Sequence, residues 1–280
     1  MSAFSHIVIG KNSIPALTVT VILMIVIPLC FFLAWRRKHR QETKIIWLIA
    51  GAAGFLVSAR VLELGVHYFC IISDNPVSRF ILGSNAAYVL YGALMAGVFE
   101  ECGRHIILKY VLKKNRTREN AVLYGIGHGG IEILFVLLPS MILMLAIAVL
   151  FSSGDTENAL RTLNITEETA AAALPSVQAA AAFDYPMMAM NVLERLMAML
   201  VHMGLTVLVF YGVRREKRGC LPLAVLLHML ADTFPALYQR GLLPLWMVEL
   251  WGALWAAVIG FLACRLYRSM AEDRTDQPPA

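Results

Sequence analysis

Residues 121–151 read AVLYGIGHGGIEILFVLLPSMILMLAIAVLF and are almost entirely apolar. A helix rises about 1.5 Å per residue, so this stretch is long enough to cross the roughly 30 Å hydrocarbon core of a bilayer. The whole chain shares this character: of its 280 residues, 59% are hydrophobic and only 15% are charged. A soluble domain needs a more polar surface than this composition allows. The stretch therefore predicts one membrane helix of a polytopic membrane protein.

Six further stretches have a similar length and composition. The seven predicted spans cover approximately residues 14–35, 45–72, 80–108, 121–151, 186–213, 221–238 and 243–266. We therefore expect an all-α transmembrane helical bundle of about seven spans, in which residues 1–280 form a single integral membrane domain. Residues 152–185 would then form an extracytoplasmic loop, as either a surface helix or a flap.

The connecting segments alternate in charge. Lys and Arg cluster after the first, third, fifth and seventh spans and are scarce in the other loops. The positive-inside rule then places the N-terminus outside and the C-terminus in the cytoplasm. The formal net charge of +5 is explained by these short basic loops, so no nucleic-acid partner is expected. The chain is predicted to be a multi-pass protein of the cell membrane, with the lipid bilayer as its surroundings.

Ionisable side chains inside the spans gather at one depth. Such residues are costly in lipid and typically mark functional sites. Counted from the nearest basic loop, four of them lie eight to twelve residues inside their helices, which is about 12–18 Å. These four residues, each from a different span, are Glu101, His128, His202 and His228. We therefore expect one carboxylate and three imidazoles to meet inside the bundle.

Two further carboxylates share helix faces with these imidazoles. Glu132 follows His128 by four residues, and Asp232 follows His228 by four, so each pair lies on one side of its helix. Four glycines surround His128 in the sequence, at positions Gly125, Gly127, Gly129 and Gly130. Their lack of side chains permits either close helix packing or the close approach of a substrate backbone.

These residues resemble a known group of membrane peptidases. Glu100-Glu101…Arg104, the aromatic Tyr124 four residues before His128, and His228-x-x-x-Asp232 are similar to the motifs of the CAAX-protease and bacteriocin-processing (CPBP) superfamily, which is of the glutamic type. With Gly-His-Gly-Gly-x-Glu on the fourth span, the chain most resembles the YhfC family within that group. The resemblance extends from the third to the sixth span. Arg104 lies one residue nearer the glutamates than is usual there, and Asp232 stands where many members have Asn.

The resemblance implies an intramembrane peptidase that hydrolyses a membrane-embedded or membrane-bound peptide. In that reading Glu101, alone or with Glu100, activates a water molecule, and His128 orients it. His228 and Asp232 hold the oxyanion or the catalytic geometry, and Arg104 tunes the glutamates. The residues expected to support this site are Glu132, His202 and Glu194.

Two questions of chemistry stay open at the level of sequence. The glutamic mechanism needs no cofactor, whereas His128, His202 and His228 with Glu132 could instead bind zinc, since three such ligands and a water form a catalytic metal site. The same Glu/His/Asp cluster could also serve a proton-coupled membrane transporter. A non-catalytic scaffold or immunity protein is the third possibility, and it predicts that Glu101→Gln keeps its full biological effect.

Overall fold

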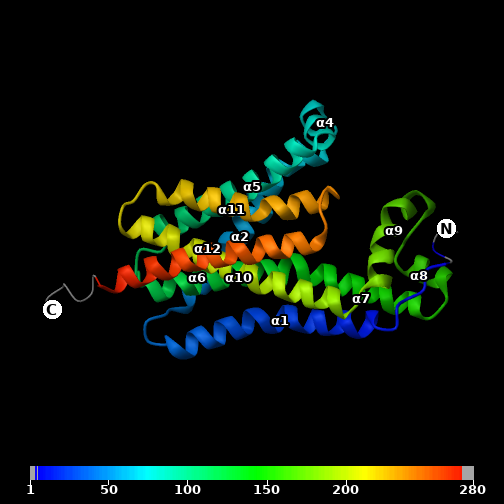
Figure 1. Ribbon diagram of the computed structural model, residues 1–280, viewed down its shortest axis with the longest axis horizontal. Coiled ribbons are helices and arrows are strands. Elements are labelled where there is room, and N and C mark those ends of the chain that lie inside the picture. The colour runs from blue at the N-terminus through cyan, green and yellow to red at the C-terminus, as the bar shows by residue number, and fades with distance from the viewer. Residues whose placement is uncertain (1–3, 5, 273–280) are drawn as a thin grey trace. The chain divides into compact units, whose positions relative to one another are not determined.

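Every regular element is a helix among the residues that the computed structural model describes, which are residue 4 and residues 6–272 (Figure 1). This confirms the all-α class. Four of the elements have the wider π-helical spacing and are labelled η. The elements are α1 (Ser13–Lys38), α2 (Ile45–Val57), η2 (Ser58–Glu63), α3 (Leu64–His67), η3 (Tyr68–Ile72), α4 (Pro76–Gly83), α5 (Asn85–Ile106), η4 (Ile107–Val111), α6 (Arg118–Glu132), η5 (Ile133–Leu137), α7 (Leu138–Ser152), α8 (Thr156–Thr162), α9 (Glu167–Ala182), α10 (Tyr185–Arg214), α11 (Cys220–Gln239) and α12 (Leu245–Glu272).

Six of the helical runs are long and apolar enough to cross a membrane, or seven if one bent pair counts as a span. The six runs are Ser13–Lys38, Ile45–Ile72, Arg118–Ser152, Tyr185–Arg214, Cys220–Gln239 and Leu245–Ala271. Each of them contains most or all of one predicted stretch. The chain is therefore a multi-pass membrane protein.

The third predicted span is not one straight helix. The structure divides it into α4 and the run Asn85–Val111, which meet at an angle of 106°. Ser84 lies between them in an extended conformation, and its hydroxyl accepts a hydrogen bond from the backbone N–H of Ala87 at 3.3 Å. A serine that caps the following helix in this way ends the preceding one. The prediction of a continuous helix over residues 80–108 was therefore wrong at its first turn.

The chain forms two compact units, and the first comprises Met1–Ile27 and Ile133–Arg195. The predicted loop over residues 152–185 folds here into α8 and α9. Helix α9 continues through Pro175 and begins with a capping box between Thr166 and Thr169. Its far end is fixed by Ser13, whose hydroxyl donates to the Ala181 carbonyl at 2.7 Å. The buried core of this unit consists of Phe4, Ala16, Leu17, Ile147, Ala148, Phe151, Ala159, Leu160, Val177, Ala180 and Phe183.

The second unit comprises Pro28–Glu132 and Leu196–Ala280. Helix α6 is buried along its length from Glu119 to Gly130 because its glycines admit the neighbouring helices. A Cβ atom at Gly127 would overlap the Leu48 carbonyl oxygen of α2, and one at Gly125 would lie 2.6 Å from Met203 Cα of α10. Of the two roles that the sequence left open for these glycines, the structure therefore supports close helix packing.

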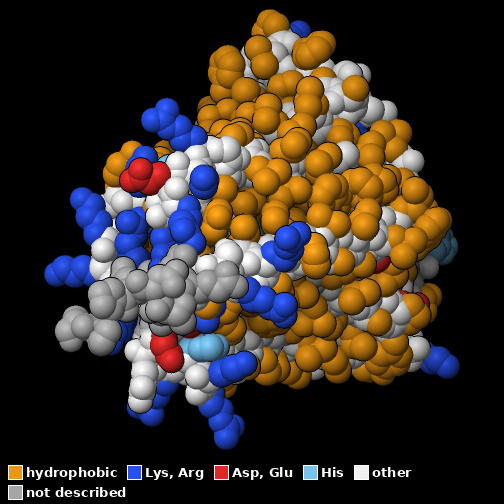
Figure 2. Space-filling model, turned by 60° about the vertical axis from the view of Figure 1, so that its left-hand side comes forward, with side chains coloured by type: hydrophobic (Ala, Val, Ile, Leu, Met, Phe, Trp, Pro, Cys, Tyr) orange, Lys and Arg blue, Asp and Glu red, His pale blue; other side chains and the backbone are white. Residues whose placement is uncertain are grey.

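The basic loops of the second unit meet at one end, which we call the basic end. The backbone N–H of Lys44, after α1, donates to the Asn120 side chain of α6 at 2.7 Å. Arg118 donates to the Tyr267 carbonyl of α12 at 2.8 Å. Figure 2 shows Lys and Arg side chains gathered on one side of the surface, next to a broad apolar area. The convergence of these loops agrees with the positive-inside assignment, which stays a prediction.

Candidate functional site

Two carboxylates and a guanidinium within little more than one turn of α5 lie in the interior of the second unit. Glu100, Glu101 and Arg104 are all buried, and Glu101 and Arg104 have no exposed surface. Helix α5 can approach its neighbours because Gly97 packs on the α11 backbone at Val225 and Gly103 packs on Ser58. These two glycines determine which faces of α5 meet the other helices. The glutamates therefore point into the bundle rather than toward lipid.

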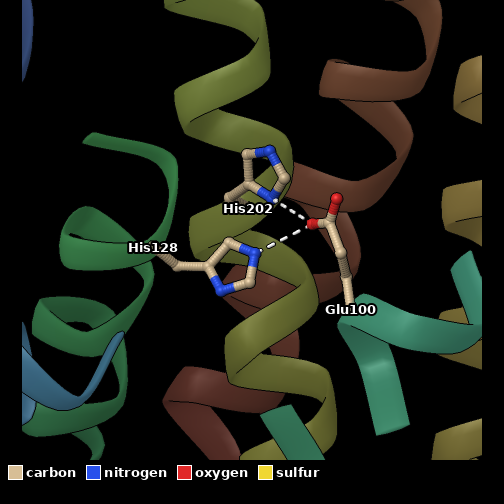
Figure 3. A group of neighbouring side chains, drawn as sticks. All are labelled: Glu100, His128 and His202. Atoms are coloured by element: carbon tan, nitrogen blue, oxygen red, sulfur yellow. Dashed lines mark hydrogen bonds and ion pairs between the residues drawn. The ribbon is translucent and has the colours of Figure 1, made fainter. Parts of the chain in front are cut away.

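Glu100 lies at the centre of the three imidazoles that the sequence predicted to meet. Its Oε2 atom lies 2.8 Å from His128 Nε2, 3.8 Å from His202 Nδ1 and 3.9 Å from His228 Nε2. The side chains come from α5, α6, α10 and α11 respectively. Figure 3 shows His128 and His202 turned toward the Glu100 carboxylate from two different helices. One donor atom from each of Glu100, His128 and His202 lies within 4.8 Å of the other two.

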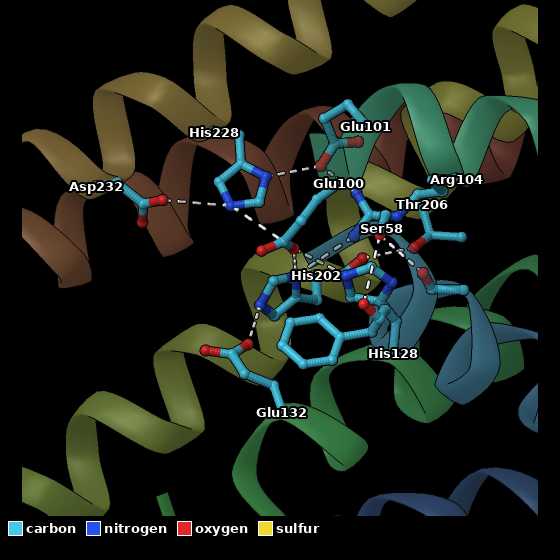
Figure 4. A network of polar contacts seen from close by, with 12 residues as sticks. Ser58, Glu100, Glu101, Arg104, His128, Glu132, His202, Thr206, His228 and Asp232 are labelled. Carbon is cyan, nitrogen blue, oxygen red and sulfur yellow. Dashed lines mark hydrogen bonds and ion pairs between the residues drawn. The ribbon is translucent and has the colours of Figure 1, made fainter. Parts of the chain in front are cut away.

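Two of the imidazoles each have a further carboxylate next to the ring nitrogen that points away from Glu100. His202 Nε2 lies 2.6 Å from Glu132 Oε2, and His228 Nδ1 lies 2.8 Å from Glu101 Oε1. His228 Nδ1 is hydrogen-bonded to Glu101, and His202 Nε2 lies within ion-pair distance of Glu132. The opposite nitrogen of each ring faces Glu100 (Figure 4). The two carboxylates therefore hold these rings in their orientation from the side away from Glu100.

Aromatic residues and hydroxyls hold the remaining groups in place. The His128 ring packs edge-on against Phe55 with 5.2 Å between centroids, and it stacks on Tyr124 at 6.2 Å. Thr206, one turn after His202, donates from its hydroxyl to the His202 carbonyl at 2.7 Å. Neither Phe55 nor Thr206 was predicted from the sequence. No sequence signal pointed to them, because an apolar or hydroxyl residue in a membrane helix is ordinary.

The cluster carries more negative than positive charge. Arg104 forms an ion pair with Glu101, and its other terminal nitrogen lies 3.4 Å from His202 Nδ1. Four carboxylates thus face one guanidinium if the imidazoles are neutral. The two least buried of these are Glu132 and Asp232, whose side chains are 23% and 38% exposed. Unpaired charge is costly in a site with so little water, so the arrangement favours a bound cation.

The structure brings together all but one of the residues that the sequence proposed. Asp232 lies 3.4 Å from His228 Nε2, on the side away from Glu101. The exception is Glu194, which is paired with its neighbour Arg195 about two turns before His202 on α10. The sequence argument gave the leading place to Glu101, whereas the structure gives the central position to Glu100 and pairs Glu101 with Arg104.

The chain is similar to known membrane proteins. The sequence profile of the family described as "YhfC intramembrane metalloprotease" matches residues 23–251. The chain belongs to the YhfC family. A relative in Bacillus subtilis (strain 168), named "Uncharacterized membrane protein YhfC", is 30% identical over 236 residues, which cover 84% of this chain and 88% of the relative. No solved structure matches the chain. The matched residues of the YhfC family profile include every residue of the cluster.

The metal in the family's description can be tested against the cluster itself. Imidazole and carboxylate donors are the usual ligands of zinc and of other first-row divalent metals. Metal-binding histidines almost always have a carboxylate or carbonyl next to their second ring nitrogen. Here Glu101 is hydrogen-bonded to His228, and Glu132 lies 2.6 Å from His202 Nε2. The Glu101 Oε2 and His128 Nδ1 atoms are buried with no hydrogen-bond partner among the described residues. The donor set therefore fits a divalent metal ion, with a carboxylate behind His202 and His228 and, in the described part of the chain, none behind His128.

Proposed function

We propose that the protein is a metal-dependent intramembrane peptidase that hydrolyses a membrane-embedded or membrane-bound peptide. The observation that carries this proposal is the convergence of donor atoms from Glu100, His128 and His202 within 4.8 Å of one another. His228 Nε2, at 3.9 Å from the same Glu100 oxygen, is the next nearest imidazole nitrogen. Glu132 then takes the role of an outer partner rather than a ligand. A divalent ion held by these residues would act as a Lewis acid toward the scissile carbonyl and activate a water molecule.

The other residues of the cluster have distinct tasks in this proposal. Glu132 and Glu101 hold His202 and His228 so that the opposite ring nitrogens face Glu100. Arg104 compensates the charge of Glu101 and so keeps that carboxylate in place. Asp232 is the most exposed acid of the cluster and can contact a substrate. We assign it the proton transfer: its Oδ2 accepts a proton from the attacking water and delivers it to the leaving amine.

The alternative for the same peptidase activity is a glutamic mechanism. This mechanism would place the protein in the CPBP superfamily. Glu101 would then activate the water without a metal. Its ion pair with Arg104 and its hydrogen bond from His228 occupy one of its oxygens and lower its basicity as a catalyst. Glu100, with three imidazoles around it, has the better position to hold either a metal or a water. The metal content of the protein distinguishes the two mechanisms.

The test measures metal content and proteolysis in the same variants. Purified wild type is expected to contain about one zinc or similar ion per chain, and Glu100→Gln and His128→Ala are expected to lose it. Membranes with the wild type should contain new peptide termini that are missing in both variants. Glu63→Gln is the matched control, because Glu63 is also a buried glutamate whose Oε1 lies 3.2 Å from a histidine nitrogen, Nε2 of His67.

Each result has a defined meaning. Metal that stays bound in both variants would refute the assigned ligands. New termini in a wild-type protein that contains no metal would favour the glutamic mechanism. The absence of any wild-type-dependent termini, with metal present, would refute peptidase activity and favour the transporter.

A further inference from the structure

A second polar cavity lies at the basic end of the second unit. It has a volume of about 610 Å³, within the roughly 300–1,000 Å³ range typical of ligand sites. Its walls come from the end of the α5–η4 run, from the loop before α6, and from the turn between α10 and α11. No residue of the Glu100 cluster lines it, so the two sites are separate. The lining residues used in the argument are Lys109, Arg116, Glu216, Lys217, Arg218 and Leu221.

The cavity has an excess of positive charge that the protein does not compensate. Four of its lining residues are Lys or Arg, against the single carboxylate of Glu216. None of these cations forms an ion pair with any residue in the described part of the chain. Arg116 donates from one terminal nitrogen to the Leu108 carbonyl at 2.7 Å, which fixes the guanidinium. Its Nε atom is buried with no partner among the described residues. A buried donor of this kind needs an acceptor.

The turn between α10 and α11 directs two consecutive cations to this place. The N–H of Lys217 donates to the Gly212 carbonyl at 2.9 Å, which closes the last turn of α10 back on itself. Glu216 occupies the left-handed position of this turn, with φ of 54°, where glycine is usually preferred. Lys217 and Arg218 follow immediately and line the cavity. The loop is thus held in a conformation that presents both cations to the cavity.

We propose that this cavity binds a phosphate group. Phosphate oxygens accept several charge-assisted hydrogen bonds at once, and Arg and Lys side chains are their usual partners. The cavity also has an apolar wall that includes Leu221. The ligand therefore either has an apolar part that contacts this wall, or it is a polar group that the wall shields from water on one side. A phospholipid headgroup and a soluble phosphate compound share this chemistry. The site is independent of the proposed peptidase activity.

The experiment measures phosphate binding to the purified full-length chain in detergent. One arm titrates phosphatidic acid in mixed micelles, with phosphatidylcholine as the comparison, and counts bound lipid by native mass spectrometry. The other arm adds inorganic phosphate at constant ionic strength and measures displacement of the lipid. The cavity variant is Lys109→Gln/Lys217→Gln. The matched control is Lys113→Gln/Lys114→Gln, which removes the same charge from exposed residues of the basic end outside the cavity.

One bound phosphatidic acid per chain is expected in the wild type. The cavity variant should bind it at least tenfold more weakly, because two charge-assisted contacts are lost, and the control should bind it as the wild type does. Displacement by inorganic phosphate would assign the site to a soluble phosphate compound, and resistance to displacement would assign it to a lipid headgroup. Equal weakening in the two double variants, or no saturable binding of either probe, would refute the site. Arg218→Gln serves as a single substitution if the cavity variant does not fold.

Discussion

Gly127→Ala should destabilise the protein by pushing α2 and α6 apart. The added Cβ would overlap the Leu48 carbonyl oxygen and lie 2.8 Å from its carbon. Both atoms belong to the α2 backbone, so no side-chain rotation relieves the overlap, and the helices themselves have to separate. Overpacking of a close-packed interior costs about 1–3 kcal/mol. Alanine recovers about 0.5–1 kcal/mol through its better helix propensity. Because backbone meets backbone here, we expect the overpacking cost to lie at its upper end and the net loss to be about 2–2.5 kcal/mol.

The same substitution tests the functional site, because His128 is the next residue. A site that must be held within about 0.5 Å loses its geometry when its helix moves. Metal affinity should therefore fall together with the melting temperature, both measured on protein in detergent. Gly65→Ala is the control, since nothing lies within 4 Å of a Cβ at that helical glycine. Its melting temperature should equal or exceed that of the wild type. A Gly127→Ala protein with unchanged stability and unchanged metal affinity would refute both the packing argument and its link to the site.

Further predictions concern the groups around Glu100. Glu132→Gln weakens the bond that orients His202, so metal affinity should fall about 10–100-fold, and a change below twofold in a competition titration with a chelator would contradict this role. Glu101→Gln leaves the buried Arg104 without its counter-charge and should cost about 3–5 kcal/mol, whereas the double variant Glu101→Gln/Arg104→Gln should recover much of that loss in thermal unfolding. Glu194→Gln should leave metal content unchanged, and loss of metal there would place Glu194 in the site.

The membrane spans could be predicted because lipid imposes a simple requirement. A helix must present about 20 apolar residues in a row, and a window over the sequence detects such a run directly. The bend at Ser84 was not predicted, because the residues on either side of it are also apolar and the average hydropathy hardly changes there. The pair Gly83-Ser84 contained the information, since glycine commonly ends a helix and serine commonly begins one. A capping signal inside an apolar run therefore indicates a break.

The depth of the site in its helices could be predicted from the sequence, but the identity of its central carboxylate could not. Counting residues from the loops brought Glu101, His128 and His228 to one level, and the structure brings them together. Neighbouring residues on a helix point about 100° apart, so sequence alone could not decide whether Glu100 or Glu101 lies between the three imidazoles. That choice depends on the rotation of α5 about its axis, which is determined by the packing of glycines such as Gly97 against α11. Such tertiary contacts leave no periodic pattern.

The arrangement of the cluster is harder to explain for a scaffold or a carrier than for an enzyme. A scaffold gains nothing from four clustered carboxylates, two of them buried, against one guanidinium, because each uncompensated charge costs stability. A proton carrier needs imidazoles that exchange partners as protons pass. Here His202 and His228 are each held from behind by a carboxylate, at 2.6 Å and 2.8 Å, with the opposite nitrogen aimed at Glu100. Rings held in one orientation suit a permanent ligand set, since a metal ion would offset the excess negative charge of the cluster.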